Sequence, residues 1–492
     1  MNPRPPLLRS ALSAVALQWT MRALGLVSLV ILARVLTPAD FGIVGLAMTA
    51  VAAAEIFSYI GMRQILIRLE QPDRSYLDSA WTIQLALFTF LALALALSAP
   101  LVATFYGEEA VEPVIAALAL RFILLGLVNI GIVDFDRNFQ FGRDLLMRLS
   151  GRIVSLILAV GIAVAYQSYW ALVAGILAQA ACLVVASYVL HPYRPRFSLV
   201  RRRELIGVSA WMFASLAAQI IQTQADRVVL GRHAGADSVG AYAVSKDLSE
   251  IFTHEIATAL NRVSFVDTSR SGTLSEQGVR ISWLLGSYAL VTAPLGLGIA
   301  AVAHDFFAVF FGQQWALAAT LTVVLAPAGA LFALSKLIVS SLQAAGQERS
   351  AAALSIGTLT LTAATLGAAV AVGRTGALEI GWATLIGCLG GLLVGLAVMA
   401  RQTRSATLAM LSHVARPFLA ALAMFAIIHQ LAWPDFPPML ALAAKVLTGI
   451  PLYAAFLVLV WLASGRPAGA EAAATSLVRA ALARTHSALR RA

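Results

Sequence analysis

The sequence is poor in charge and in cysteine. Only 12% of its 492 residues are charged, and it has two cysteines, Cys182 and Cys388. A soluble domain carries roughly 25% charged residues, so this chain has too few to coat a water-soluble globule of its size. Both cysteines lie inside apolar runs, where we expect neither a structural disulfide nor redox or zinc chemistry.

Several enzyme signatures are also missing. No Walker-type phosphate loop occurs, which argues against ATP use by the chain itself. His254-Glu255 begins like a zinc-hydrolase motif, but Thr258 stands where the second histidine is needed. Short alternating strands, as a membrane β-barrel would need, are not seen. We therefore expect no enzyme activity, no cofactor and no metal, apart from H⁺ or Na⁺ as a coupling ion.

Long apolar runs dominate what is present. Hydrophobic residues make up 60% of the chain, and the mean hydropathy is +0.84. A helix needs about 20 mostly apolar residues to cross the hydrocarbon, and its backbone groups are satisfied internally. The sequence predicts an all-α membrane protein of about fourteen transmembrane helices. The predicted spans are 11–36, 41–66, 79–105, 113–133, 146–167, 168–190, 206–232, 238–264, 280–303, 316–343, 350–372, 378–400, 410–431 and 439–463.

The distribution of Lys and Arg orients these spans. Of 35 such residues, 25 fall in or next to loops on one side of the predicted membrane, with Arg416 counted among them, and 3, namely Arg34, Arg232 and Arg374, fall in or next to loops on the other. Positive loops mark the cytoplasmic side. This predicts a multi-pass inner-membrane protein with both termini in the cytoplasm and a first helix that is retained. The net charge of +11 then reflects this bias, and no nucleic-acid partner is expected.

An internal repeat divides the predicted spans. Leu32, Arg34 and Gly42 reappear as Leu230, Arg232 and Gly240 at an offset of 198, and weaker matches follow in the same order at slightly larger offsets. Six spans per repeat give a parallel duplication, as in some transporters. The predicted organisation is a six-helix lobe over 1–200, a second over 201–403, two further helices over 404–465 and a basic cytoplasmic tail over 466–492.

Several segments together resemble a known family. The strings ILARVLTPADFGIVGLA, LIRLEQPDRSYLDSAW, APLVATFYG, WALVAGILAQ and HPYRPRFSL are similar to those of the polysaccharide transporter family, the Wzx-type flippases. The resemblance implies two pseudo-symmetric six-helix lobes around a central cavity, and movement of an undecaprenyl-diphosphate-linked oligosaccharide from cytoplasm to periplasm. One departure is that Ser264-Phe265-Val266 stands where such proteins often carry Phe-Pro.

Charged residues within spans are candidates for transport because a charge at mid-membrane costs roughly 2.5–3.5 kcal/mol and should face protein or water. In the first half, Arg22 lies near mid-bilayer and Glu55 is a candidate partner or coupling carboxylate. Arg121 and Arg152 could meet a diphosphate on entry. The alternatives are a structural salt bridge for the first two and snorkelling to the headgroups for the others.

The second half supplies a polar stripe. Asp247, Glu250 and His254 are spaced to share one helical face, and Lys246 and Glu250 form an i,i+4 pair. The alternative to a cavity lining is neutral pairing within the helix. The candidate substrate contacts of this half are Arg227, Lys246 and Lys336. The candidate ion-coupling residues are Asp226, Asp247, Glu250, His254 and Glu255.

These features predict a flippase or exporter of a lipid-linked saccharide (O-antigen, capsule or exopolysaccharide unit) working by alternating access. Its expected partners are the polyprenyl-linked saccharide, membrane lipids and a polysaccharide polymerase with its export machinery. One alternative is a multidrug (MATE-like) drug or cation exporter. Another is a membrane saccharide polymerase or ligase, against which the short outer loops argue.

Overall fold

A computed structural model describes residues 5–58, 62–69, 73–138, 140–205, 210–268, 274–403, 407–434, 436–467 and 469–472. Over these residues the chain is helical and contains no β-strand. It forms two compact units. One comprises Met1–Ala243 with Thr375–Ala377, and the other Val244–Arg374 with Leu378–Ala492.

The first unit is a bundle in which α7 packs on α8 and α1, and α4 packs on α5 and α2. Small apolar clusters hold it together, one of them around Leu32, Leu36 and Ala163. Its elements are α1 (Pro5–Val35), α2 (Pro38–Ser58), α3 (Met62–Arg68), α4 (Arg74–Tyr106), α5 (Val111–Gly126), η1 (Ile130–Ile132), α6 (Val133–Arg137), α7 (Phe141–Tyr166), α8 (Trp170–Leu190), α9 (Arg202–Leu205) and the first part of α10 (Ala210–Thr268).

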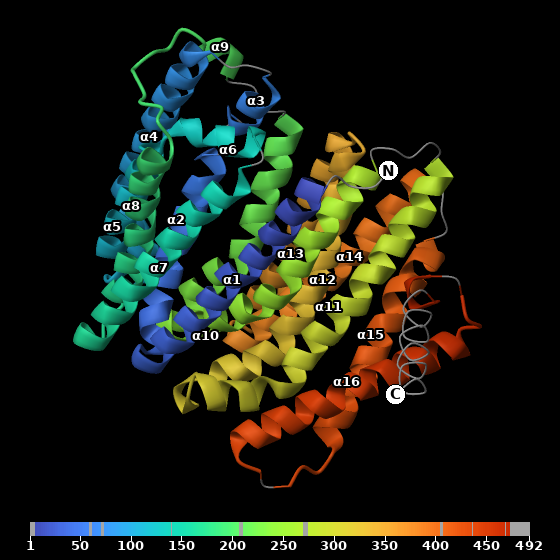
Figure 1. Ribbon diagram of the computed structural model, residues 1–492. Helices are drawn as coiled ribbons and strands as arrows, with labels where there is room; N and C mark the ends of the chain where they lie inside the picture. The colour runs from blue at the N-terminus through green and yellow to red at the C-terminus, as the bar shows by residue number, and fades with distance from the viewer. Residues whose placement is uncertain are drawn as a thin grey trace, which may run out of the picture. The chain divides into compact units, whose positions relative to one another are not determined.

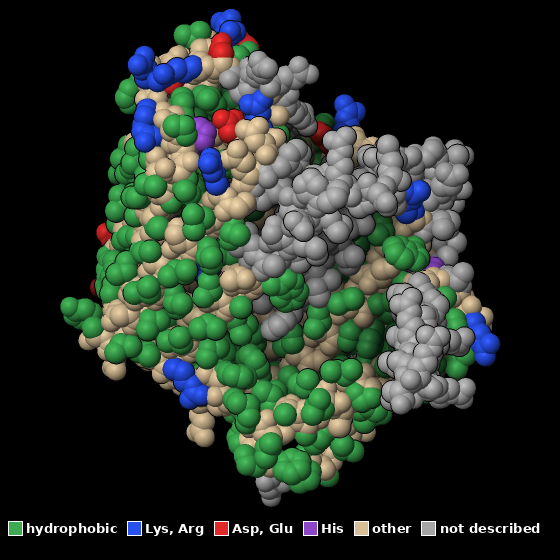
Figure 2. All heavy atoms as spheres, in the orientation of Figure 1, with side chains coloured by type: hydrophobic (Ala, Val, Ile, Leu, Met, Phe, Trp, Pro, Cys, Tyr) green, Lys and Arg blue, Asp and Glu red, His purple; other side chains and the backbone are tan. Residues whose placement is uncertain are grey.

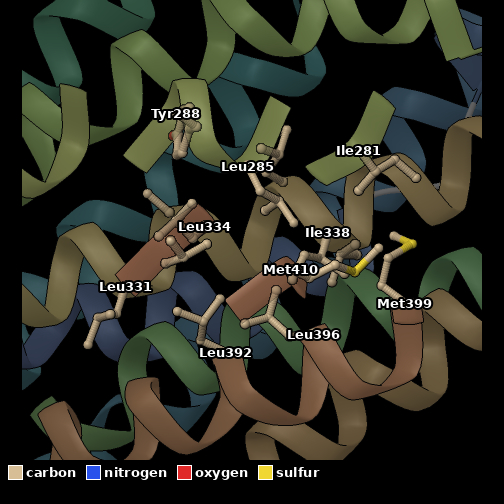
Figure 3. Packing of buried hydrophobic residues seen from close by; sticks show 14 of the residues in the cluster. Ile281, Leu285, Tyr288, Leu331, Leu334, Ile338, Leu392, Leu396, Met399 and Met410 are labelled. Carbon is tan, nitrogen blue, oxygen red and sulfur yellow. The ribbon is translucent and has the colours of Figure 1, made fainter. Parts of the chain in front are cut away.

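The second unit is built around α11 (Leu274–Phe310), which packs against α12 (Ala316–Ala344), α15 (Thr407–Gln430) and α16 (Pro438–Ala463). Figure 3 shows one of its apolar clusters, where leucine and methionine side chains of several helices pack together. The remaining elements are η2 (Gln313–Trp315), α13 (Glu348–Ala371) and α14 (Ala377–Thr403).

The predicted spans agree with the helices. Each predicted span overlaps a helix, and ten helices within the described residues are long and apolar enough to cross a membrane. The chain is therefore an all-helical, multi-pass membrane protein. The count of about fourteen crossings stays a prediction. The predicted span 41–66 ends earlier than expected, because α2 stops at Ser58 and a separate helix, α3, begins at Met62.

The break between the predicted spans 11–36 and 41–66 falls at a capped turn. The Thr37 amide and hydroxyl donate to the Asp40 carboxylate at 2.9 and 2.7 Å, and the Asp40 amide donates back to the Thr37 hydroxyl at 3.3 Å. This reciprocal pairing satisfies donors at the start of α2 that have no helical partner. The second carboxylate oxygen of Asp40 accepts from the Tyr169 amide at 3.1 Å, which fixes the start of α8 beside it.

At the corresponding place in the second repeat, the long helix α10 is broken. Gly235 has φ 76° and ψ 173°, outside the helical region. A residue with a side chain rarely adopts such a positive φ, so glycine permits the kink. The break falls between the predicted spans 206–232 and 238–264, which are therefore two helices in one continuous segment.

The matched glycines of the repeat contact each other's segments. A Cβ on Gly42 would lie 1.8 Å from the Ala236 carbonyl oxygen, and a Cβ on Gly240 would lie 1.8 Å from the Pro38 carbonyl oxygen. Gly240 and Ala236 are Gly42 and Pro38 shifted by the repeat offset of 198. The contact is therefore reciprocal, as at a two-fold interface, and it supports the internal repeat.

A face of α14 that carries glycines is a packing surface. Cβ atoms on Gly387 and Gly391 would lie 3.1 Å from Thr362 and Thr358 of α13, and one on Gly395 would lie 3.1 Å from Ile338 of α12. As the α14 numbers rise by four, the α13 numbers fall by four, so the two helices run antiparallel in close contact. Small residues let membrane helices approach in this way.

One end of the first unit carries a polar cap. Figure 1 shows α3, α6 and α9 gathered at the start of α4, and Figure 2 shows charged side chains concentrated there above an apolar flank. The segment 191–201 is strapped across this end through Asp78 of α4. The Asp78 carboxylate accepts from the Tyr193 hydroxyl at 2.5 Å and from the Arg196 amide at 3.0 Å.

The strap begins at His191, whose ring leaves no room for a Cβ on Gly131. Its Nδ1 accepts from the Tyr193 amide at 3.2 Å, and its Nε2 lies 3.4 Å from the Asp134 carboxylate. These contacts assign the neutral tautomer with the proton on Nε2. Burial lowers the pKa of His191 below its ordinary value of 6.5. The Arg143 and Arg194 charges act in the same direction, and Asp134 opposes them.

Acidification is therefore expected to loosen the strap. Because the folded pKa is lowered, stability from neutral His191 is present above about pH 6.5 and is lost as the pH falls below it. Protonation of Nδ1 would remove the acceptor for the Tyr193 amide. We expect the protection of that amide against hydrogen exchange, measured relative to its intrinsic rate at each pH, to fall between pH 7.5 and 5.5. In His191→Asn, whose amide oxygen can accept in place of Nδ1 without titrating, this loss of protection should disappear; equal loss in both proteins would contradict the assignment.

Arg416 corrects the sequence-based charge count. It was counted as a cytoplasmic loop residue, but it lies on α15 and its side chain is only 6% exposed. Its guanidinium lies 3.2 Å from the carboxylate of Glu471, which is 1% exposed, and 3.0 Å from His413. The chain after α16 returns Glu471 to this site, and a buried arginine is tolerated because it is paired. Residues 473–492 of the predicted tail lie outside the described residues.

Candidate functional site

Two predicted cations of the first unit lie together. Arg22 on α1 and Arg152 on α7 are close enough for their positive charges to interact. A Cβ on Gly25 would lie 2.8 Å from the Arg152 guanidinium, so this group lies against α1 one turn beyond Arg22. Both side chains are partly exposed. Two like charges held close together repel, and a bound anion would relieve that repulsion.

Glu55 is not the partner of Arg22 that the sequence suggested. Its carboxylate lies 2.6 Å from the Arg121 guanidinium, with side-chain exposures of 38% for Glu55 and 23% for Arg121. The reason is packing, since α2 lies against α5. Sequence reasoning could place both residues within spans but could not determine which helices are neighbours. The Arg121 guanidinium is therefore already paired with a carboxylate, and a substrate would have to compete with Glu55 for it.

Asp226 is 1% exposed and already hydrogen-bonded. One carboxylate oxygen accepts from the Tyr242 hydroxyl and the other from the Arg227 amide, both at 2.8 Å. Tyr242 follows the kink at Gly235 and Asp226 precedes it, so this bond ties the two parts of α10 together. Arg227 is partly buried on the same helix.

In the second unit, α10 runs beside α12. The Ser245 and Thr322 hydroxyls are 2.9 Å apart, and a Cβ on Gly329 would lie 3.5 Å from the Ser249 carbonyl oxygen. Both residue numbers rise together, so the helices are parallel, as expected for two even-numbered spans. This arrangement places α12 along the predicted polar stripe.

Lys336 of α12 meets that stripe. Its ammonium lies 4.9 Å from the Phe332 ring centroid and within electrostatic range of Glu250 and Lys246. Glu250 and Lys246 are partly buried, whereas Asp247 is exposed. The structure thus brings three of the predicted residues of this half together. The side chains of His254 and Glu255 lie outside the described residues.

Sequence reasoning missed the residues that anchor the strap. Asn129 is fully buried; its side-chain amide donates to the Tyr193 carbonyl at 2.8 Å, and its carbonyl accepts from the Gly131 amide at 2.9 Å. Asp78 is the other anchor. The available signal was a polar residue inside the quoted strings or at the end of a span, but only the fold shows that these residues meet.

The chemistry of both clusters is that of charge binding. Lysine and arginine ammonium and guanidinium groups suit phosphate oxygens. Within the described residues, no group of three or more His, Cys, Asp or Glu side chains could hold a metal ion. Neither cysteine forms a disulfide bond, and Cys388 is buried whereas Cys182 is partly buried.

Comparisons with known sequences agree with this picture. A family model described as "Polysaccharide biosynthesis protein" matches residues 31–320. The succinoglycan biosynthesis transport protein ExoT of Rhizobium meliloti is 27% identical over 297 residues, or 59% of this chain and 60% of that protein. The lipopolysaccharide biosynthesis protein WzxC of Escherichia coli is 22% identical over 298 residues, with the same coverage. The chain thus spans about three fifths of the length of these two relatives.

A third relative extends the match. The teichuronic acid biosynthesis protein TuaB of Bacillus subtilis is 25% identical over 384 residues, or 75% of this chain and 77% of that protein.

Solved structures show the same fold. The inward closed lipid II flippase MurJ aligns with a TM-score of 0.73 at 14% identity, covering 92% of this chain and 99% of that chain. An inward-facing multidrug resistance MATE family transporter aligns with a TM-score of 0.62 at 15% identity, covering 79% and 98%. Because the family model matches more than half of the sequence, the chain belongs to the polysaccharide biosynthesis protein family, that of the Wzx-type flippases which it resembles.

Proposed function

We propose that the protein is a transporter, not an enzyme, and that it moves an undecaprenyl-diphosphate-linked oligosaccharide from the cytoplasmic to the periplasmic leaflet by alternating access. The family and its transport-named relatives support transport in polysaccharide biosynthesis. The observation that carries the proposal is the proximity of Arg22 and Arg152. A diphosphate is anionic and cannot enter hydrocarbon unaided, and paired arginines offer it a favourable place within a membrane protein.

The membrane potential supplies a driving force. With the cell interior negative, two negative charges moving outward through 100 mV release about 4.6 kcal/mol, at about 2.3 kcal/mol per charge. Arg22, Arg121, Arg152, Arg227, Lys246 and Lys336 are the proposed substrate contacts. The polyprenyl tail stays in the surrounding lipid while the head group passes along these side chains.

An ion gradient provides a second proposed input. Protonation of Glu55 would remove its charge and release Arg121 for the diphosphate, because the two groups now neutralise each other at 2.6 Å. A proton arriving from the outside would thus prepare the substrate site. Asp226, Asp247, Glu250, His254 and Glu255 are the other proposed carriers of H⁺ or Na⁺.

The topology follows the charge bias. We place the protein in the inner membrane with both termini in the cytoplasm, and divide it into lobes 1–200 and 201–403, helices over 404–465 and a basic tail over 466–492. The strapped, charge-rich end of the first unit then faces the cytoplasm. The proposed partners are membrane lipids and the polymerase and export machinery that use the delivered saccharide.

The alternative of a drug or cation exporter is favoured only by the MATE-like fold. A cation site calls for acidic groups, whereas Arg22 and Arg152, which lie together in the first unit, are both positively charged.

Deletion of the gene is the decisive experiment. We expect one undecaprenyl-diphosphate-linked oligosaccharide to accumulate, and the purified protein to move that intermediate across proteoliposomes at a rate that rises with an imposed potential. Accumulation of no such intermediate would overturn the proposal, and drug efflux from the same vesicles would favour the exporter.

A further inference from the structure

A hollow of about 250 Å³ lies on the first unit, at the end of α4 that the charge bias assigns to the outer leaflet. Helix α4 ends at Tyr106 in this hollow, and Gly107 caps the helix with φ 70°. Its walls come from α2 and α4 and consist of Thr49, Ala50, Leu101, Val102, Phe105 and Tyr106.

The walls are mostly apolar, and two of the lining residues are exposed. Leu101 is 73% exposed and Phe105 46%. The only side-chain hydroxyls, those of Thr49 and Tyr106, are 2.8 Å apart, and Thr49 also donates to the Leu46 carbonyl at 2.6 Å. Because these polar groups are satisfied by each other, the hollow offers little to water and suits a hydrocarbon chain.

A cation stands at the rim. The Arg232 guanidinium lies 5.7 Å from the Phe105 ring centroid. Its position follows from the preceding residue, because a Cβ on Gly231 would lie 2.9 Å from the Tyr106 ring. Arg232 is exposed, and within the described residues it forms no ion pair. An arginine at headgroup depth above an apolar groove complements a lipid phosphate.

The volume of the hollow indicates which kind of lipid it can bind. At about 250 Å³ it is smaller than the roughly 300–1,000 Å³ of pockets that enclose whole drug-sized ligands. It can take a segment of one chain beneath one phosphate. A polyprenyl phosphate has a single chain, whereas a glycerophospholipid has two.

We infer that the hollow between α2 and α4, with Arg232 at its rim, binds the phosphate and first isoprenoid units of a polyprenyl carrier in the outer leaflet. This inference rests on the proposed function, since it describes where the carrier lies after transport. Arg232 holds the phosphate, and Leu101 and Phe105 line the chain.

Photo-crosslinking tests the inference. The full chain, with a benzophenone amino acid in place of Leu101, is placed in vesicles of phosphatidylethanolamine and phosphatidylglycerol containing radiolabelled undecaprenyl phosphate. We expect crosslinking to the labelled lipid, reduced at least fivefold by Arg232→Gln and by Ala50→Trp, which fills the hollow. Arg374→Gln, an exposed arginine predicted on the same membrane side, is the matched control and should leave crosslinking unchanged.

Other outcomes overturn the inference. Crosslinking no stronger than from a benzophenone at Leu97, a lipid-facing residue outside the hollow, would do so. Crosslinking only to phosphatidylglycerol would also overturn it, as would labelling that is unchanged by Arg232→Gln. Melting temperatures verify that each variant is folded. Oligosaccharide transport in the same vesicles separates the two proposals: transport without labelling defeats only the carrier site, whereas absence of transport by the unmodified chain defeats the proposed function.

Discussion

Replacing Gly42 with alanine is expected to lower transport at least tenfold. The new Cβ would lie 1.8 Å from the Ala236 carbonyl oxygen, a distance that forces the backbones of α2 and α10 apart. Overpacking costs typically 1–3 kcal/mol, and each 1.4 kcal/mol is a tenfold change in population. The conformation with these helices in contact would become rare, and a cycle that passes through it would slow. Gly240→Ala should behave alike, because its Cβ would meet the Pro38 carbonyl at the same distance.

Gly45 provides the matched control. It lies one turn from Gly42 on α2, and a Cβ there would lie 3.5 Å from Val239, an ordinary contact. Gly45→Ala should retain transport within about twofold, since it neither strains nor opens the packing. Transport is measured as oligosaccharide flux in proteoliposomes, with melting temperature in parallel. A Gly42→Ala protein with unchanged flux would show that the close helix contact has no part in the cycle.

Replacing Arg152 with a neutral residue is expected to have the second large effect on transport. Arg152→Gln should reduce flux by about 10- to 100-fold, because hydrogen bonds to charged groups contribute about 1.5–3 kcal/mol. The same change should leave the melting temperature unchanged or raise it, since it removes repulsion from Arg22. Arg152→Lys should recover part of the flux, because the charge remains while the two-pronged geometry is lost.

Arg148 is the control for Arg152. It lies one turn earlier on α7, is 48% exposed and pairs with Asp144 at 2.9 Å. Exposed pairs of this kind contribute about 0–1 kcal/mol, so Arg148→Gln should change flux by no more than about twofold. Equal losses in the two variants would mean that α7 responds to general surface charge, and the anion site at Arg152 would have to be abandoned.

The helices could be predicted from the sequence because the membrane constrains them strongly. Apolar runs of the required length leave little choice but a helix, and the breaks at Thr37 and Gly235 carry recognisable turn chemistry. The repeat was visible in Gly42 and Gly240, although their contact was not. Whether a segment is helical follows from its own residues, whereas the helices that lie next to it depend on the packing of the whole bundle.

For the candidate site, too, the sequence predicted the residues but not their partners. Depth within a span identified Arg22, Glu55, Arg121 and Arg152 as costly to insert. Their partners could not be deduced. The sequence suggested Arg22 as the partner of Glu55, but α2 packs on α5, and Glu55 therefore pairs with Arg121. Arg416 looked like a loop cation because its carboxylate, Glu471, lies 55 positions away and returns only through the fold.

The reciprocal approach of Gly42 and Gly240 limits how a duplicated gene can diverge. After duplication, the two copies are ordinarily free to accumulate separate substitutions. Here a side chain gained in either copy collides with the main chain of the other, so each glycine constrains the opposite half of the protein. Sister sequences descended from the same duplication should therefore retain two small residues here, or replace them only together with a shift of both helices.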